Sequence, residues 1–268
     1  MLKDITLGQY FPGESAVHRL DPRLKILLVL AYIILLFVVE GPVSYGVLAV
    51  FLALVVGLSR VSIRMVFRGI KPILFIIIFT SLLNMFYTPG RVLWEWGFLR
   101  LTVEGIFAAV IMVVRLVFLI VGTSMLTYTT SPIVLTDGLE RLLSPLKRVH
   151  FPAHELAMMM TIALRFIPTL VEETGKIMNA QKARGADFES GGLIHRARAL
   201  IPILVPLFVS SFRRADELAV AMECRLYRGD VGRTRMRELK ITRSDIRTTA
   251  VCLLFFALAL AVHLAVGL

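Results

Sequence analysis

Five long apolar stretches alternate with polar segments along this chain of 268 residues. A helix needs about 20 residues to cross the hydrocarbon core of a bilayer, with a usual range of roughly 17–25. The first two stretches are slightly short, but their flanking side chains can reach towards the interface and complete them. The pattern therefore predicts an all-α polytopic membrane protein with about five transmembrane helices, over residues 24–39, 43–58, 70–87, 105–128 and 246–268.

The polar region between the fourth and fifth stretches predicts long helices outside the bilayer. Ser131-Pro132 is a typical helix start, and the helix that it opens should end near Lys147. Two longer helices follow, over about residues 153–182 and 193–225, each with an apolar first half and a charged second half. The apolar half of the first is about 24 Å long, which is short of the roughly 30 Å core. We expect both helices to lie along the inner membrane face. If their apolar halves crossed the bilayer instead, the two extra spans would leave each terminus on the same side of the membrane.

Composition and charge fix the expected orientation. Hydrophobic residues make up 57% of the chain, against roughly 45–50% in soluble domains. The net charge is +11, and most Lys and Arg residues lie between the fourth and fifth stretches. Cytoplasmic loops are the ones enriched in Lys and Arg. We therefore predict a cytoplasmic N-terminus, an extracellular C-terminus and three parts: a membrane domain (1–128), a cytoplasmic region of long helices (129–245) and a last transmembrane helix (246–268).

The residues of an enzyme or metal site are missing from the sequence. Gly175-Lys176 lacks the upstream glycine and the hydroxyl residue of a phosphate-binding loop, and His154-Glu155 lacks a second histidine at helical spacing. The five histidines are scattered, which disfavours a metal centre. We expect no bound cofactor, no nucleic-acid partner and no catalysis by this chain. Arg115, in the middle of the fourth stretch, should pair inside the helix bundle rather than serve transport.

Both long helices end in an arginine. Arg184 is followed by Gly185, and Arg225 is followed by Leu226. The helix dipole alone favours an arginine at a C-terminus, so one such end would mean little. Two such ends on similarly built helices indicate a function, because a guanidinium fork can bind a partner's carboxylate bidentately. Leu resists the left-handed conformation that Gly adopts, so we expect the second helix to continue about a turn further, towards Arg228.

Three segments carry a resemblance to a known family: HRLDPRLKILL, RFIPTLVEETGKIMNAQKARGADF and LIPILVPLFVSSFRRADELAVAMECR. With them the chain resembles the transmembrane coupling (T) subunit of energy-coupling factor transporters, which are ABC-type importers. The resemblance covers nearly the whole chain. It implies that the long helices are coupling helices in a bacterial cell membrane. It also implies two ABC-type ATPase subunits that bind ATP and Mg, a small substrate-binding membrane subunit, and uptake of vitamins or similar micronutrients.

The resemblance also assigns roles to residues of this chain. The ends of the two coupling helices would dock on the ATPases through Ala183, Arg184, Gly185, Cys224, Arg225 and Leu226. Three consecutive methionines fan around a helix and cannot converge on one metal ion, so an adaptable packing surface explains them better. The expected coupling surface towards the substrate-binding subunit comprises Met158, Met159, Met160, Leu204 and Leu207.

Two other functions remain open from the sequence. A self-contained secondary transporter would need ionisable groups or broken helices at mid-membrane depth, and only Arg115 and some helix-end prolines qualify. An intramembrane enzyme is disfavoured because the sequence offers no catalytic constellation. Proton-coupled uptake by the isolated chain would favour the secondary transporter.

Overall fold

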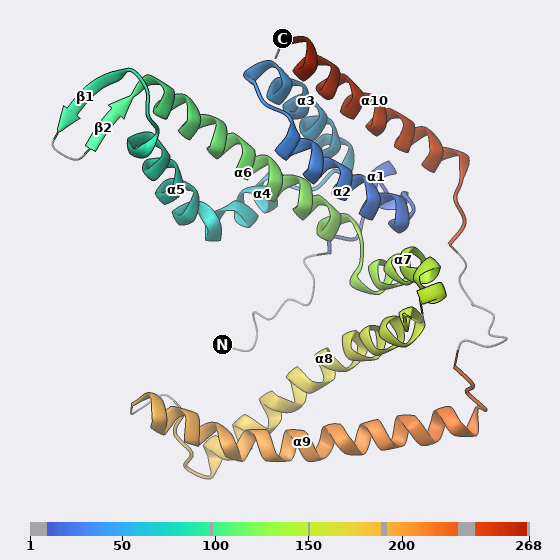
Figure 1. Cartoon of the computed structure of the whole chain (residues 1–268). Helices are drawn as coiled ribbons and strands as arrows, with labels where there is room; N and C mark the ends of the chain where they lie inside the picture. The colour runs from blue at the N-terminus through green and yellow to red at the C-terminus, as the bar shows by residue number, and fades with distance from the viewer. Residues whose placement is uncertain (1–9, 97–98, 150, 189–191, 230–238, 267–268) are drawn as a thin grey trace. The chain divides into compact units, whose positions relative to one another are not determined.

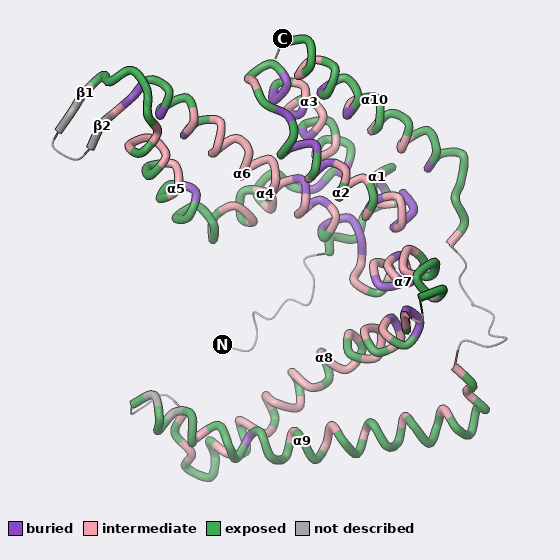
Figure 2. The backbone as a smooth tube through the Cα atoms, viewed as in Figure 1, coloured by how far each residue is buried: buried purple, intermediate pink, exposed green. Residues whose placement is uncertain are grey.

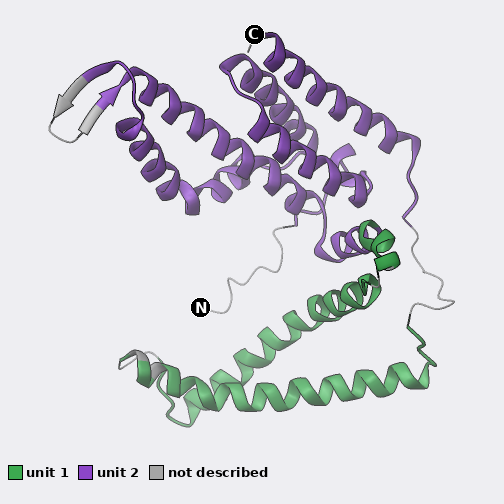
Figure 3. Cartoon of the chain, in the orientation of Figure 1, with its two compact units in different colours: residues 1–7, 142–238 green, residues 8–141, 239–268 purple. Residues whose placement is uncertain are grey.

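A computed structural model describes residues 10–96, 99–149, 151–188, 192–229 and 239–266 of the chain (Figure 1). The chain divides into two compact units (Figure 3). The first, which we call the bundle unit, comprises residues 8–141 and 239–268. The second, the long-helix unit, comprises residues 1–7 and 142–238.

The bundle unit is built almost entirely of helices. Local sequence sets several of their ends: the Asp21 side chain caps the helix that begins at Pro22, and Gly41, with φ +97°, precedes the helix that begins at Pro42. Proline suits the first helical turn, where its missing N–H is not needed. The helices are α1 (Ala16–Arg19), α2 (Pro22–Val38), α3 (Pro42–Ser59), α4 (Ile63–Ile70) with the 3₁₀ turn Lys71–Ile73, α5 (Leu74–Tyr87), α6 (Val103–Thr129), α7 (Pro132–Leu143) and α10 (Arg243–Val266).

A short antiparallel hairpin joins α5 to α6. Its strands are β1 (Val92–Trp96) and β2 (Leu99–Thr102), with Val92 opposite Thr102 and a bulge between Val92 and Trp94. These strands were not predicted from the sequence.

The core of the bundle unit lies where α2, α3, α6 and α10 meet. Leu36, Leu48 and Ala259 are fully buried there. The hydroxyl of Tyr32 on α2 donates to the carbonyl of Phe118 on α6, at 3.0 Å. A Cβ atom at Gly122 would lie 2.4 Å from the Tyr32 ring. Glycine is therefore required at this position for α2 and α6 to approach so closely.

Within the described residues, five helical segments are long and apolar enough to cross a membrane. Four of them match predicted spans, and they cover residues 42–59, 63–87, 103–129 and 243–265. The fifth is α8, because its apolar half satisfies the same criteria of length and hydropathy. The first predicted span is the 17-residue helix α2, which is shorter than those five. The prediction of an all-α membrane protein with about five such helices is thus confirmed, and the placement of α8 along the inner membrane face stays a prediction.

The long-helix unit consists of the 3₁₀ segment Ser144–Val149 and two long helices, α8 (Ala153–Ala183) and α9 (Leu193–Cys224). The bounds of both helices agree closely with the predicted ones. The predicted end of the preceding helix near Lys147 was wrong, because α7 ends at Leu143. Pro145 explains the change, since it cannot donate an α-helical hydrogen bond. Figure 2 shows that most of α8 and α9 is exposed or half-buried.

Candidate functional site at the ends of the two long helices

The first long helix ends in a Schellman motif around Arg184. Arg184 is the C-cap residue, and Gly185 follows in the left-handed region at φ +88°. The Gly185 N–H donates to the Lys182 carbonyl, and the Ala186 N–H donates to the Gln181 carbonyl, both at 3.0 Å. These two bonds satisfy carbonyls that the end of a helix leaves without partners. The chain therefore turns away directly after the arginine.

The second long helix ends in the same motif. Arg225 is its C-cap residue, and Leu226 adopts the left-handed conformation at φ +53°. The Leu226 N–H donates to the backbone carbonyl of Glu223 at 2.8 Å, and the Tyr227 N–H donates to the backbone carbonyl of Met222 at 3.0 Å. The prediction that this helix continues towards Arg228 was wrong. Two closing hydrogen bonds hold Leu226 in a conformation that its side chain disfavours, so Arg225 occupies the position that Arg184 occupies on α8.

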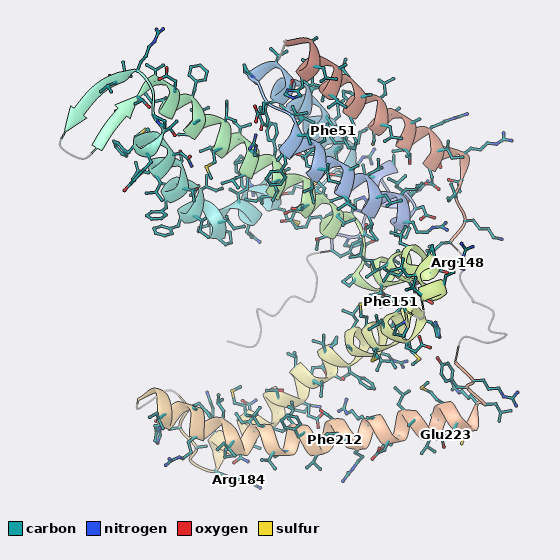
Figure 4. All side chains as sticks on the ribbon, viewed as in Figure 1. Phe51, Arg148, Phe151, Arg184, Phe212 and Glu223 are labelled. Carbon is teal, nitrogen blue, oxygen red and sulfur yellow. The ribbon has the colours of Figure 1, made fainter. Side chains whose placement is uncertain are left out.

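Both arginine side chains are available to a partner. Each is exposed, and neither guanidinium forms a hydrogen bond or ion pair in the part of the chain that the structure describes. An arginine kept only for its own helix would be expected to contact the last carbonyls of that helix. Figure 4 shows Arg184 and Glu223, near the ends of α8 and α9, at opposite ends of the helix pair. Because Arg225 follows Glu223 by two residues, the two arginines lie at opposite ends of the helix pair.

A polar cluster joins the two helices near their middle. The carboxylate of Glu173 on α8 accepts hydrogen bonds from Arg214 and from the Ser210 hydroxyl on α9, both at 2.5 Å. Its partners lie on one stripe of α9 with Ile203 and Leu207, at helical spacing. This cluster was not predicted from the sequence. One feature of the sequence could have indicated it: Glu173 and Arg214 each precede the arginine at the end of their helix by the same number of residues.

The outward face of α9 carries an exposed apolar stripe. Its residues follow the spacing of one helix face, and each has about half or more of its surface exposed: Ile201 52%, Leu204 47%, Val205 56%, Phe208 61% and Phe212 67%. Exposed apolar patches of this kind mark surfaces that contact lipid or a protein partner.

The predicted coupling-surface residues divide between the exposed and half-buried classes. Met159 and Leu204 are exposed. Met158, Met160 and Leu207 are half-buried. Met158 accepts a hydrogen bond from the Tyr227 hydroxyl, so it takes part in the contact between the long helices. Their role towards a substrate-binding subunit stays a prediction.

Arg115 lies within α6, in the bundle unit, and pairs there with a tyrosine. Its Nε atom donates to the Tyr45 hydroxyl at 2.8 Å, and its guanidinium carbon lies 5.9 Å from the centre of the Tyr45 ring. This contact matches the expected pairing inside the bundle. Among the described residues, no group of three or more His, Cys, Asp or Glu side chains could hold a metal ion.

Residues 13–236 match the family model CbiQ, described as cobalt transport protein. The chain is also similar to three proteins named "Energy-coupling factor transporter transmembrane protein EcfT". It is 54% identical to that of Ruminiclostridium cellulolyticum, over 95% of this chain and 96% of the relative. It is 58% identical to that of Thermosediminibacter oceani, over 91% and 92%. It is 48% identical to that of Bacillus subtilis, over 91% and 93%.

The chain belongs to this EcfT family. It is therefore a multi-pass membrane component of an energy-coupling factor transporter, which confirms the resemblance seen in the sequence. The coverage extends over both units, so the arginine ends of α8 and α9 lie within the region shared with these relatives.

Proposed function

We propose that this chain couples ATP hydrolysis by two ABC-type ATPase subunits to the movement of a small substrate-binding membrane subunit, for uptake of vitamins or similar micronutrients. The observation that carries the proposal is the pair of matching helix ends. Arg184 and Arg225 cap two different helices with the same backbone motif, and both guanidinium groups are exposed and free of partners within the described residues. One docking end for each of two similar partners accounts for this duplication.

The proposed docking chemistry is a charge-assisted bidentate hydrogen bond. A guanidinium presents its donors in a planar fork that matches a carboxylate. We propose that residues 183–185 and 224–226 enter a groove on each ATPase, where the arginine binds an acidic side chain. The negative end of the helix dipole lies behind each arginine and helps to hold its positive charge.

The exposed stripe of α9 and the methionines of α8 support the other half of the proposal. We assign the substrate-binding subunit to the exposed apolar side chains of the two helices, among them Leu204 and Phe208 on α9 and Met159 on α8. Methionine side chains adapt to a surface that changes during a transport cycle. We propose further that both helices lie at the cytoplasmic face, with the N-terminus inside and the C-terminus outside, as the distribution of Lys and Arg favours.

A self-contained secondary transporter is less well supported. Such a protein places ionisable groups at mid-membrane depth where they can bind a coupling ion or substrate. Arg115, the candidate identified in the sequence, is engaged by Tyr45 through both its Nε atom and the aromatic ring.

Co-purification of tagged ATPase subunits with variants of this chain tests the proposal. We expect Arg184→Ala and Arg225→Ala each to weaken ATPase binding, and the double variant to abolish it. Loss of one partner of a desolvated charge pair costs about 2–5 kcal/mol, whereas loss of a helix-dipole interaction costs about 0.3–1 kcal/mol. Arg213→Ala is the matched control, because Arg213 is exposed on α9 but lies away from either end. Normal ATPase binding in the double variant would exclude docking through these ends.

A further inference from the structure

Tyr227 connects the end of α9 to the beginning of α8. The left-handed turn at Leu226 reverses the chain, and the Tyr227 hydroxyl then donates to the Sδ atom of Met158 at 3.0 Å. The same hydroxyl lies 3.1 Å from the Nε2 atom of His154, which donates to it when Nε2 carries the ring proton. His154 is only 6% exposed, and Ala153 and Ala157 beside it are 1% and 3% exposed. The contact therefore holds the second arginine end against the most buried part of α8.

Within the described residues, polar contacts therefore join the two long helices at two separate points. One is the cluster of Glu173, Ser210 and Arg214, and the other is the contact of Tyr227 with His154 and Met158. Two helices that touch at one point can rotate about that contact and change their crossing angle. A second contact, well away from the first, prevents this rotation unless one of the two contacts breaks. The contacts therefore make α8 and α9 a braced pair.

The strained backbone of Leu226 is consistent with this role. A non-glycine residue in the left-handed region is disfavoured, and such conformations persist only where the surroundings enforce them. Leu226 is 75% exposed, so burial of its own side chain does not explain the turn. The turn instead directs Tyr227 onto α8 while the adjacent Arg225 stays exposed.

We infer that Tyr227 is a positioning residue that braces the second docking end against the start of α8, so that a displacement imposed at Arg225 reaches the methionines of α8 directly. This inference rests on the proposed function. Tyr227 does not itself bind an ATPase or the substrate-binding subunit. It makes the two helices move together. A displacement imposed by the ATPases therefore moves both helices and does not merely rotate one helix against the other.

The test uses the complete transporter, reconstituted in liposomes, with Tyr227→Phe in this chain. The substitution keeps the ring and removes only the hydroxyl. We expect the ATPases to remain bound and to hydrolyse ATP at the normal rate, while substrate uptake per ATP hydrolysed falls by about three- to ten-fold, the equilibrium factor of one neutral hydrogen bond. Tyr87→Phe is the matched control, because Tyr87 is 79% exposed and far from α8 in the chain. A purely structural hydroxyl would change thermal stability without changing this ratio.

A second variant tests whether the effect passes through α8. Met158→Leu keeps an apolar side chain but removes the sulfur acceptor, and in combination with Tyr227→Phe it should lower the ratio no further, because loss of the hydroxyl has already removed the contact with the sulfur. Additive losses would overturn the inference, and so would an unchanged ratio in Tyr227→Phe. Loss of ATPase binding in Tyr227→Phe would also overturn it, because the tyrosine would then belong to the docking surface. Failure of the proposed function is recognised separately, by normal ATPase binding in the double arginine variant.

Discussion

Glu173 of α8 and Arg214 of α9 form an ion pair of 2.5 Å, and each stands eleven residues before the arginine that ends its helix. At about 1.5 Å per residue, each arginine is roughly 16 Å along its helix from the crossing. The two proposed docking ends are thus equally far along their helices from this contact. Equal distances suit the proposed binding of two ATPases of similar shape.

Loss of this ion pair should destabilise the long-helix unit. The side chains are only 22% and 33% exposed, so Glu173→Ala leaves the Arg214 charge partly buried without its partner. We expect a loss of about 1–3 kcal/mol. Glu172→Ala is the matched control, because Glu172 is the exposed neighbour. Thermal unfolding of the purified chain measures both. Equal melting temperatures for the two variants would show that the pair contributes nothing.

Relief of the strain at Leu226 should stabilise the end of α9. Asparagine enters the left-handed region more readily than leucine, so Leu226→Asn should stabilise the chain by about 0.5–1 kcal/mol. Leu226→Ala should be nearly neutral, because alanine meets the same penalty and the leucine side chain is largely exposed. Gly185→Ala should be destabilising, since φ is +88° there. A lower melting temperature for Leu226→Asn than for Leu226→Ala would contradict the assignment of strain.

The sequence predicted the helices well because their signals are local. Prolines at positions 22, 42 and 132 open helices, and Gly185 ends one, as backbone geometry requires. The left-handed turn at Leu226 could not be predicted in this way. The residue's own propensity opposes it, and it is stabilised partly by Tyr227 contacts with residues about seventy positions earlier.

The hairpin between α5 and α6 was missed for a related reason. A two-stranded hairpin is marginally stable by itself. This one is supported by hydrogen bonds at its base, where Thr102 donates to the Thr88 carbonyl and Glu104 accepts from the Arg91 N–H. Those bonds depend on the packing of α5 against α6, which a single sequence does not reveal. The partners of Glu173 and Arg115 were inaccessible for the same reason.

The Tyr45 hydroxyl should matter for stability only while Arg115 is present. Tyr45→Phe removes the hydroxyl that accepts from Arg115, and a charged group at membrane depth without its partner is costly. We expect a loss of about 1–3 kcal/mol in the wild-type background and little or none with Arg115→Leu. Thermal unfolding in lipid nanodiscs would measure the four proteins of this double-mutant cycle. The same loss in both backgrounds would show that the hydroxyl acts elsewhere.

Asp21 should make the bundle unit sensitive to acid. Burial opposes ionisation of its carboxyl group, but hydrogen bonds from the Arg23 side chain and backbone prevail and hold its pKa below the ordinary value of 3.8. A lowered pKa means that the stabilisation is complete above pH 3.8 and is lost as the pH falls through the folded-state value. Asp21→Asn should therefore be less stable than wild type at neutral pH and should lose less stability on acidification. Parallel pH profiles for the two proteins would contradict this role.

The central claim is that this chain transmits energy from partner ATPases rather than transporting a substrate alone. The most direct measurement is substrate uptake into liposomes that contain this chain, both ATPases and the substrate-binding subunit, compared with liposomes that carry the Arg184→Ala/Arg225→Ala variant and with liposomes that carry this chain alone. We predict ATP-dependent uptake only with the complete wild-type set. Uptake by the isolated chain driven by a proton gradient, or undiminished ATP-dependent uptake with the double variant, would contradict the account.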